Sequence, residues 1–239
     1  MISVFMPVYN GERYIGEAIQ SIVNQTYTEF ELLIVDDAST DGTVGIISQW
    51  VRKDRRIRAF YLPHVGAVHA RNFALNQVNQ RHRYLMNHDS DDISFPDKFR
   101  TLVEFLESHP SIAVVGCFAD YIDAQGHFLR ELKLITQPEE FRQNYHVVNS
   151  LINSAALIRR TVFAAVGNYR DEYNSVDDYD FFARTLMAGF DLANVPQKLH
   201  KIRLHPQSMG STRLQLQERL AEKVREKLRN YARAAAVLA

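Results

Sequence analysis

Short apolar runs alternate with segments of helical spacing along the first half of the chain. Four runs predict buried strands, namely Ile2–Val8, Phe30–Val35, Ile57–Leu62 and Tyr84–Asn87. Four segments that repeat apolar residues every three to four positions predict helices, namely Glu12–Gln25, Val44–Lys53, His69–Asn79 and Lys98–Ser108. Strands that alternate with helices in this way predict an α/β fold with a mostly parallel central sheet flanked by helices.

The pattern changes from Ile112 onward. Two strands, Ile112–Tyr121 and Phe128–Leu134, flank a turn at residues 123–126, and Asp178–Ala188 has helical spacing. Leu192–Leu204 is expected to include a further short strand. Because no linker rich in Pro, Gly or Ser separates the halves, we expect a single domain over residues 1–212. Its halves are residues 1–115 and residues 116–212.

The tail, Leu214–Ala239, is predicted to form an amphipathic helix. Five apolar residues fall on a single stripe, namely Leu216, Leu220, Val224, Leu228 and Tyr231. Seven basic and three acidic residues lie between Arg213 and Arg233. Three interpretations remain open: the helix packs on its own domain, it lies on a membrane surface and attracts anionic lipid, or it forms a dimer contact.

Polar clusters follow three of the predicted strands, at Tyr9-Asn10, Asp36-Asp37 and Asp89–Asp92. In parallel sheets ligands bind at the carboxyl ends of the strands. We therefore expect the three clusters to border one ligand site.

Three carboxylates lie within the run Asn87-His88-Asp89-Ser90-Asp91-Asp92. Carboxylates this close repel each other unless a cation lies between them, and an all-oxygen ligand set suits Mg²⁺ or Mn²⁺. The alternative is an acidic turn that caps the following helix, where Asp97 precedes Lys98–Ser108.

Composition narrows the class of protein. The 239 residues are 46% hydrophobic and 23% charged, as in an ordinary globular domain, and the 28 basic residues balance 28 acidic ones, so nothing points to nucleic acid. The single cysteine, Cys117, lies in an apolar run and is interpreted as a core residue of a reduced, intracellular protein. No apolar run approaches the length of a membrane span. We expect a cytoplasmic protein whose membrane contact, if any, is peripheral and at the inner face.

Several motifs together resemble the family 2 glycosyltransferases of the GT-A fold. In chain order they are Val8-Tyr9-Asn10, residues 35–43 (Val-Asp-Asp-Ala-Ser-Thr-Asp-Gly-Thr), residues 66–72 (Gly-Ala-Val-His-Ala-Arg-Asn), Asp89-Ser90-Asp91-Asp92, Asp177-Asp178-Tyr179-Asp180-Phe181 and Arg203-Leu204-His205. The resemblance extends from residue 2 to about residue 212 and leaves the tail uncovered. It implies a Rossmann-like nucleotide-binding half and an acceptor half.

The resemblance also implies a reaction: an inverting transfer of a sugar from a nucleotide diphosphate sugar to an acceptor hydroxyl. The implied acceptor is a glycan or a lipid-linked molecule of surface polysaccharide synthesis. The processive synthases of this family carry a Gln-x-x-Arg-Trp motif and membrane spans. Since Trp50 is the only tryptophan, a non-processive enzyme is expected.

Carried over from the family, Pro7 and Tyr9 border the nucleotide base, and Asp37 accepts a hydrogen bond from the ring N–H of uracil, which favours a UDP-sugar. Arg71 is expected near the phosphates. Asp36, Ser39, Asp41 and Gly42 are interpreted as turn and cap residues.

Asp89 and Asp91 match the Asp-x-Asp pair of the family. Asp91 is expected to bind the metal directly, with Asp89 supporting it through the ribose, the metal or its waters. His205 contacts the diphosphate or completes the metal shell. Asp92 is expected to stabilise the turn.

Asp178 matches the family's catalytic base, which removes the proton from the acceptor hydroxyl. The preceding residue is Asp177, where the family has glutamate, and Asp180 is expected to be structural. The alternative for Asp178 is an N-cap of the following helix.

Other classes of protein remain to be weighed. A Rossmann dinucleotide enzyme requires a Gly-x-Gly-x-x-Gly turn, which the chain lacks. A metal-dependent nucleotidyltransferase is the closer alternative, but it favours a basic Gly-rich loop near the N-terminus. A non-catalytic scaffold that binds nucleotide sugars would be expected to have lost Asp91 or Asp178, and both are present.

Overall fold

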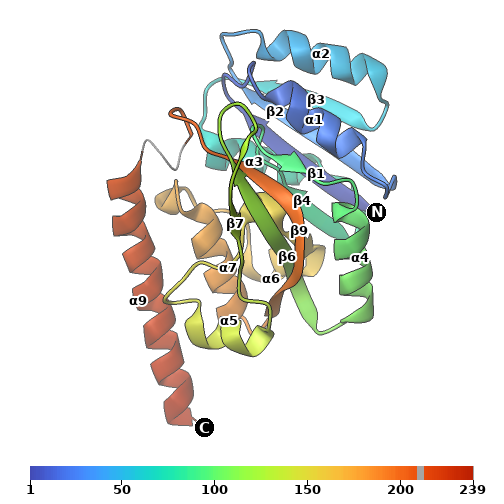
Figure 1. Cartoon of the computed structure of the whole chain (residues 1–239). Coiled ribbons are helices and arrows are strands. Elements are labelled where there is room, and N and C mark those ends of the chain that lie inside the picture. The colour runs from blue at the N-terminus through green and yellow to red at the C-terminus, as the bar shows by residue number, and fades with distance from the viewer. Residues whose placement is uncertain (209–212, 239) are drawn as a thin grey trace.

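The strands predicted in the first half form a parallel sheet in the computed structural model (Figure 1). β1 (Ile2–Val8) lies between β2 (Phe30–Asp37) and β4 (Tyr84–Asn87), and β3 (Ile57–Leu62) forms the edge beside β2. β2 is longer than predicted and includes the two aspartates at its end. The structure describes residues 1–208 and 213–238.

The second half extends the same sheet with strands of both directions. β8 (Leu157–Arg159) pairs antiparallel with β4 and with β6 (Ile112–Ile122), and β9 (Asp191–Arg203) runs parallel to β6. β5 (Ile93–Ser94) pairs antiparallel with β9, and β7 (Phe128–Leu132) pairs antiparallel with β6. The α/β fold is therefore confirmed, while the sheet is mixed beyond β4. β9 is a strand of 13 residues, longer than the short strand expected there.

Helices cover both faces of the sheet. α1 (Ile15–Val23), α2 (Thr43–Lys53) and α4 (Lys98–Ser108) pack on one face, and their buried residues share a core with Ile2, Val4 and Met6 of β1. The opposite face carries α3 (Ala67–Gln77), α5 (Pro138–Asn144), α6 (Arg160–Val166), α7 (Asp177–Met187) and α9 (Leu214–Leu238). The alternation of side chains along a strand explains the two cores, because Phe5 of the same strand joins the second one. The short helices α5 and α6 were not predicted.

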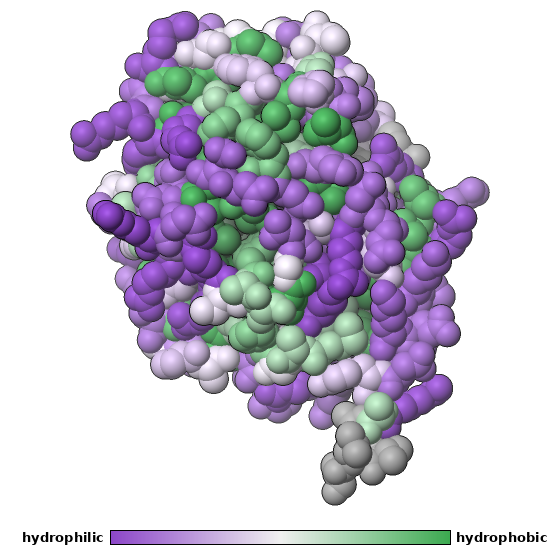
Figure 2. Space-filling view, turned by 180° about the vertical axis from the view of Figure 1, so that it is seen from behind, coloured by the Kyte–Doolittle hydropathy of each residue, from purple (hydrophilic) through white to green (hydrophobic). Residues whose placement is uncertain are grey.

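The C-terminal helix α9 packs on its own domain, which confirms the first of the three interpretations. Leu220, Val224 and Leu228 are buried and lie beside α7, whereas Tyr231 at the end of the predicted stripe is 45% exposed. In Figure 2 the flank that runs down to the grey C-terminal atoms is mostly hydrophilic. Among the described helices, none has the length and apolar character needed to cross a membrane.

Replacing Leu228 with alanine should lower the free energy of unfolding by about 2–5 kcal/mol, because the side chain is 7% exposed and its removal leaves a cavity under α9. Leu214, on the same helix but 66% exposed, provides the matched control, and Leu214→Ala should have little effect. Urea denaturation followed by circular dichroism measures both. Equal effects would show that α9 does not stabilise the domain.

Candidate active site

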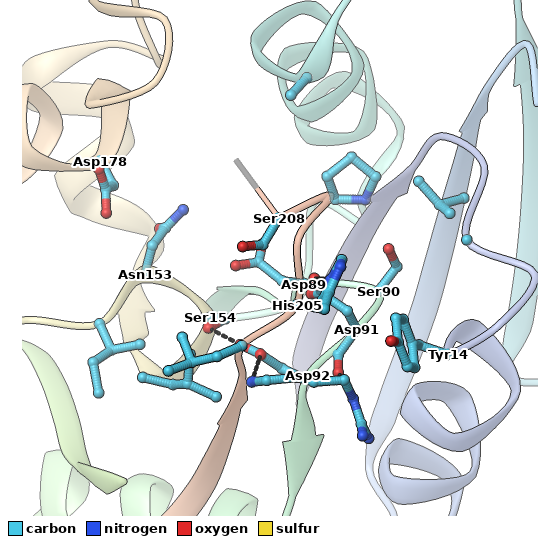
Figure 3. A pocket seen from close by; sticks show the side chains of 18 of the residues that line it. Tyr14, Asp89, Ser90, Asp91, Asp92, Asn153, Ser154, Asp178, His205 and Ser208 are labelled. Atoms are coloured by element: carbon cyan, nitrogen blue, oxygen red, sulfur yellow. Dashed lines mark hydrogen bonds and ion pairs between the residues drawn. The ribbon is translucent and has the colours of Figure 1, made fainter. Parts of the chain in front are cut away.

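A cavity of about 1400 Å³ opens at the carboxyl ends of β1, β2 and β4. Residues 7–14 and 89–92 line it from the first half, and residues 148–154 line it from the second. Asp37, Arg71, Asp178 and His205 also border it, and Figure 3 shows Asp178 and Asn153 on one side of the pocket and Asp89 and Tyr14 on the other. The three polar clusters therefore share one site, as the sequence predicted.

One end of the cavity is bordered by an exposed aromatic pair. Tyr9 is 50% exposed and its ring lies 4.6 Å from that of His64, centroid to centroid. The buried carboxylate of Asp37 accepts hydrogen bonds from the backbone N–H groups of Val65 (2.6 Å) and Gly66 (3.0 Å). Asp37 thus holds the loop before α3, where Gly66 has a φ of 89° that side chains disfavour. Neither this anchoring nor His64 was predicted.

The loops after β1 and β2 are joined by reciprocal hydrogen bonds. The N–H of Asn10 donates to Oγ of Ser39 (2.8 Å), and the N–H of Glu12 donates to Oδ2 of Asp41 (3.1 Å). Asp36 accepts from the N–H of Ser39 (3.1 Å) and so closes the turn after β2. The predicted turn roles are confirmed, and these hydrogen bonds hold the two loops together at this end of the cavity.

The acidic run places Asp89 and Asp91 in the wall of the cavity. Oδ2 of Asp91 lies 2.9 Å from Nε2 of His205, and this hydrogen bond raises the pKa of the imidazole. Removal from bulk water, followed by repulsion from Asp92, raises the pKa of Asp89 to about 7. The structure therefore pairs Asp91 with His205 and places Asp89 in the wall of the same cavity, while the assignment of these residues to a metal stays a prediction.

Asp92 lines the base of the cavity but is almost fully buried, in keeping with its expected role in the turn. Its carboxylate accepts hydrogen bonds from Oγ of Ser154 (2.7 Å) and from the N–H of Arg203 (3.0 Å), and lies 2.9 Å from Nε2 of His200. The fully buried ammonium of Lys98 donates to the carbonyl of Ser154 (2.8 Å). This network fixes the acidic loop from below. Residues 89–92 do not cap α4: its N-cap position is Asp97, as the alternative expected, but the side chain of Asp97 makes no capping hydrogen bond.

Arg71 connects the two halves of the domain. Its guanidinium forms an ion pair with Asp177 of α7, and Nη2 lies 4.0 Å from Oδ1 of Asp89. The side chain is buried, which opposes its charge, yet Asp177 and Asp89 raise its pKa. Arg71 therefore lines the cavity as predicted, but with one face already paired. The pairing with Asp177 had no signal in the sequence.

Asp178 faces the cavity from the first turn of α7. Burial, followed by repulsion from Asp177, raises the pKa of Asp178 to about 7, although Arg71 acts in the opposite direction. The N-cap alternative is wrong, because the helix begins at Asp177 and Val176 is its N-cap residue. Asp180 has the expected structural role, since it forms a buried ion pair with Arg184 at 2.8 Å.

Carboxylates outnumber cationic side chains around the cavity. The described lining residues include eight carboxylates, Glu12, Asp37, Asp41, Asp89, Asp91, Asp92, Asp177 and Asp178. They include five Lys or Arg side chains, Arg13, Arg71, Lys133, Arg203 and Arg213. The raised pKa values of Asp89 and Asp178 neutralise part of this excess near pH 7, and the remaining carboxylates favour a cation beside any anion that enters the cavity.

The donor set at Asp91 and His205 fits such a cation. Within residues 1–208 and 213–238, no group of three His, Cys, Asp or Glu side chains forms a ready metal cage. Mg²⁺ and its analogues are usually held by only one or two protein carboxylates, with phosphate oxygens and waters completing the shell. The site therefore suits a cation that arrives together with a phosphate ligand.

Comparison with known proteins gives consistent matches. The family model described as "Glycosyl transferase family 2" matches residues 3–167. An uncharacterized glycosyltransferase of Haemophilus influenzae is 27% identical over 235 residues, covering 94% of this chain and 72% of that protein.

Two solved structures share the fold. Staphylococcus aureus TarS (residues 1–349), in complex with UDP-GlcNAc, superposes with a TM-score of 0.73 at 21% identity, covering 88% of this chain and 60% of that one. The mannosyltransferase PcManGT of Pyrobaculum calidifontis, in complex with GDP-Man and Mn²⁺, superposes with a TM-score of 0.69 at 20% identity, covering 90% and 60%. The chain thus spans about three fifths of the length of these structures, and the match confirms the expected GT-A architecture.

Proposed function

This chain belongs to glycosyl transferase family 2, and from that premise we propose that it transfers a sugar from a nucleotide diphosphate sugar to an acceptor hydroxyl with inversion at the anomeric carbon. The observation that carries the proposal is the placement of Asp178 across one cavity from Asp91 and His205. In this proposal one wall of the cavity holds the general base, and the opposite wall holds the binding site for the diphosphate of the donor.

The base step follows from the environment of Asp178. A general base works best when its pKa lies near the operating pH, and the pKa of Asp178 is raised to about 7. Its carboxylate takes the proton of the acceptor hydroxyl while the hydroxyl oxygen bonds to the anomeric carbon. The bond between that carbon and the diphosphate oxygen breaks at the same time, and the nucleoside diphosphate leaves. Attack from the face opposite the leaving group inverts the configuration.

The diphosphate is proposed to lie at the acidic loop. A divalent cation, Mn²⁺ or Mg²⁺, held by Asp91 and His205 with support from Asp89, would neutralise the diphosphate and the charge that develops on it. Arg71 lies 4.0 Å from Asp89 and adds a fixed positive charge to the same wall. The excess of carboxylates around the cavity supports this assignment, since a cation reduces their repulsion of an anionic donor.

The base of the donor is proposed to bind at Pro7, Tyr9 and Asp37. Tyr9 offers an exposed ring for stacking. Asp37 accepts two backbone hydrogen bonds and lies 3.0 Å from Nδ1 of His64, and its carboxylate still has a lone pair for a base N–H. These contacts suit uracil, and a UDP-sugar is the favoured donor. A growing surface glycan or a lipid-linked acceptor is the proposed acceptor class, received by the half from residue 116 to residue 212.

A thermal-shift panel tests the proposal. UDP-GlcNAc, GDP-Man, UDP and GDP are each added with and without Mn²⁺. At a free concentration of about 100 Kd a true ligand stabilises the fold by about 2.7 kcal/mol, which raises Tm by roughly 5–10 °C. We expect stabilisation by a nucleotide sugar that depends on Mn²⁺. If a broad panel of nucleotide sugars leaves Tm unchanged with either metal, the proposed function is wrong.

A further inference from the structure

Asn153 is a buried polar residue that lines the cavity on the same side as Asp178. It begins the short 3-10 turn Asn153–Ala155 and is 7% exposed. Figure 3 shows it between Asp178 and Asp89, with its amide nitrogen directed into the open space between them. Nothing in the motif pattern pointed to this residue.

Only one side of the Asn153 amide has a protein partner. Oδ1 accepts a hydrogen bond from the hydroxyl of Tyr169 at 3.1 Å, whereas no acceptor for Nδ2 occurs within the described chain. The hydrogen bond itself places the oxygen of the amide at Tyr169, and burial raises the pKa of Tyr169, so that the hydroxyl stays protonated and able to donate. The N–H groups are thereby left to the cavity. Nδ2 is open to the cavity and not sealed in the interior, so a ligand oxygen that enters there takes the place of water as its acceptor.

The amide is held in this orientation by the surrounding structure. The amide of Asn72 donates to the carbonyl of Tyr169 at 2.8 Å and accepts from its N–H at 3.2 Å, which fixes Tyr169 in place. Ser154, the next residue along the turn, is tied to Asp92 at 2.7 Å. A donor group fixed before the ligand arrives binds without an ordering cost.

The location of Asn153 indicates which part of the donor it contacts. In the proposed function, on which this inference rests, the diphosphate lies at Asp91 and His205 and the acceptor hydroxyl lies at Asp178. The anomeric carbon of the transferred sugar is bonded to the diphosphate and is attacked by the acceptor hydroxyl, so the sugar must occupy the space between the two. We propose that Asn153 donates a hydrogen bond from its amide nitrogen to a hydroxyl oxygen of the transferred sugar, and that it thereby selects among donor sugars.

The test compares Asn153→Ala and Tyr169→Phe with two controls outside the cavity, Asn144→Ala and Tyr173→Phe. UDP-GlcNAc and GDP-Man are assayed with Mn²⁺, and kcat/KM is measured beside the Kd of UDP and GDP, which lack the sugar. We expect Asn153→Ala to lower kcat/KM by about 10–100-fold and Tyr169→Phe by about 5–10-fold. The Kd values should stay within about twofold in both variants, and both controls should match the wild type.

Monodeoxy analogues of the accepted donor identify the contacted hydroxyl. The wild type should turn over one of these analogues more slowly than the full donor sugar. Asn153→Ala should turn over that analogue and the full donor at the same rate, because the two changes remove the same hydrogen bond. Unchanged kcat/KM, or an equal loss of UDP affinity, would overturn the assignment. If Asn153→Ala does not fold, the kcat/KM and Kd values of Tyr169→Phe test the proposal in its place: an unchanged kcat/KM in that variant would overturn it. A wild-type chain that binds these nucleotides but turns over no donor sugar overturns both proposals.

Discussion

Asp178→Asn is expected to lower sugar transfer by about 10²–10⁴-fold, the usual contribution of a general base, while donor binding stays close to that of the wild type. Asparagine keeps the shape of the side chain but cannot accept the acceptor proton. Initial rates of nucleoside diphosphate release, measured with acceptor present, give kcat, and calorimetry gives the donor Kd. A wild-type rate in this variant would remove Asp178 from the mechanism.

The pH dependence supplies a second signature of the same residue. The ionised form of Asp178 is the active one, and its pKa is raised to about 7, so transfer should rise with pH through that value. Between pH 8 and pH 5.5 the ionised fraction falls about 30-fold, and kcat should fall with it. Asp180→Asn is the matched control on the same helix. Because Asp180 pairs with the buried Arg184, its replacement should lower stability but leave the pH midpoint unchanged.

Asp91→Ala is expected to abolish the dependence of transfer on Mn²⁺ or Mg²⁺ and to lower kcat/KM by about 10³-fold, since a bound cation contributes several kcal/mol to the charge that develops on the leaving diphosphate. The fold should persist, because Asp91 is partly exposed and the buried network below the loop runs through Asp92. The rate is measured across a metal titration.

Asp171→Ala provides the control for Asp91→Ala. Asp171 is an exposed aspartate that lies outside the cavity and contacts only His69, at 3.6 Å, among the ion pairs of the described residues. Its replacement should leave the metal titration unchanged. Metal-stimulated transfer at the wild-type level in Asp91→Ala would contradict the assignment of the diphosphate end of the site.

Much of the first half could be predicted because its signals are local. Ile2–Val8, Ile57–Leu62 and Tyr84–Asn87 form strands with the predicted bounds, since an uninterrupted apolar run between turn residues leaves few other structures. The second half was predicted less well. β5 has only two residues, and α5 and α6 have seven each, which is too short for a period to be recognised.

Within the candidate site, too, the residues with local sequence signals were predicted, and their distant partners were not. The positions of Asp37, Asp91 and Asp178 follow from motifs that are contiguous in the chain. Their partners do not, because Arg71 and Asp177 are separated by 106 residues and Asp91 and His205 by 114. A side-chain pattern carries no information on which distant segment completes a hydrogen bond, so Lys98, His200 and Asn153 had no signal as members of the site.

The sequence by itself determined the alternation of strands and helices from β1 to β4, the buried face of α9, and the acidic and polar clusters that end β1, β2 and β4. These properties depend on spacings of two to four residues and on the chemistry of single turns. Only the tertiary structure decided the rest. Because β8 enters the sheet between β4 and β6, the second half is placed across the strand ends, and Asp178, His205 and Asn153 come to face Asp89 and Asp91 across one cavity. The order of strands in a sheet is set by packing of the whole chain, which no local spacing encodes.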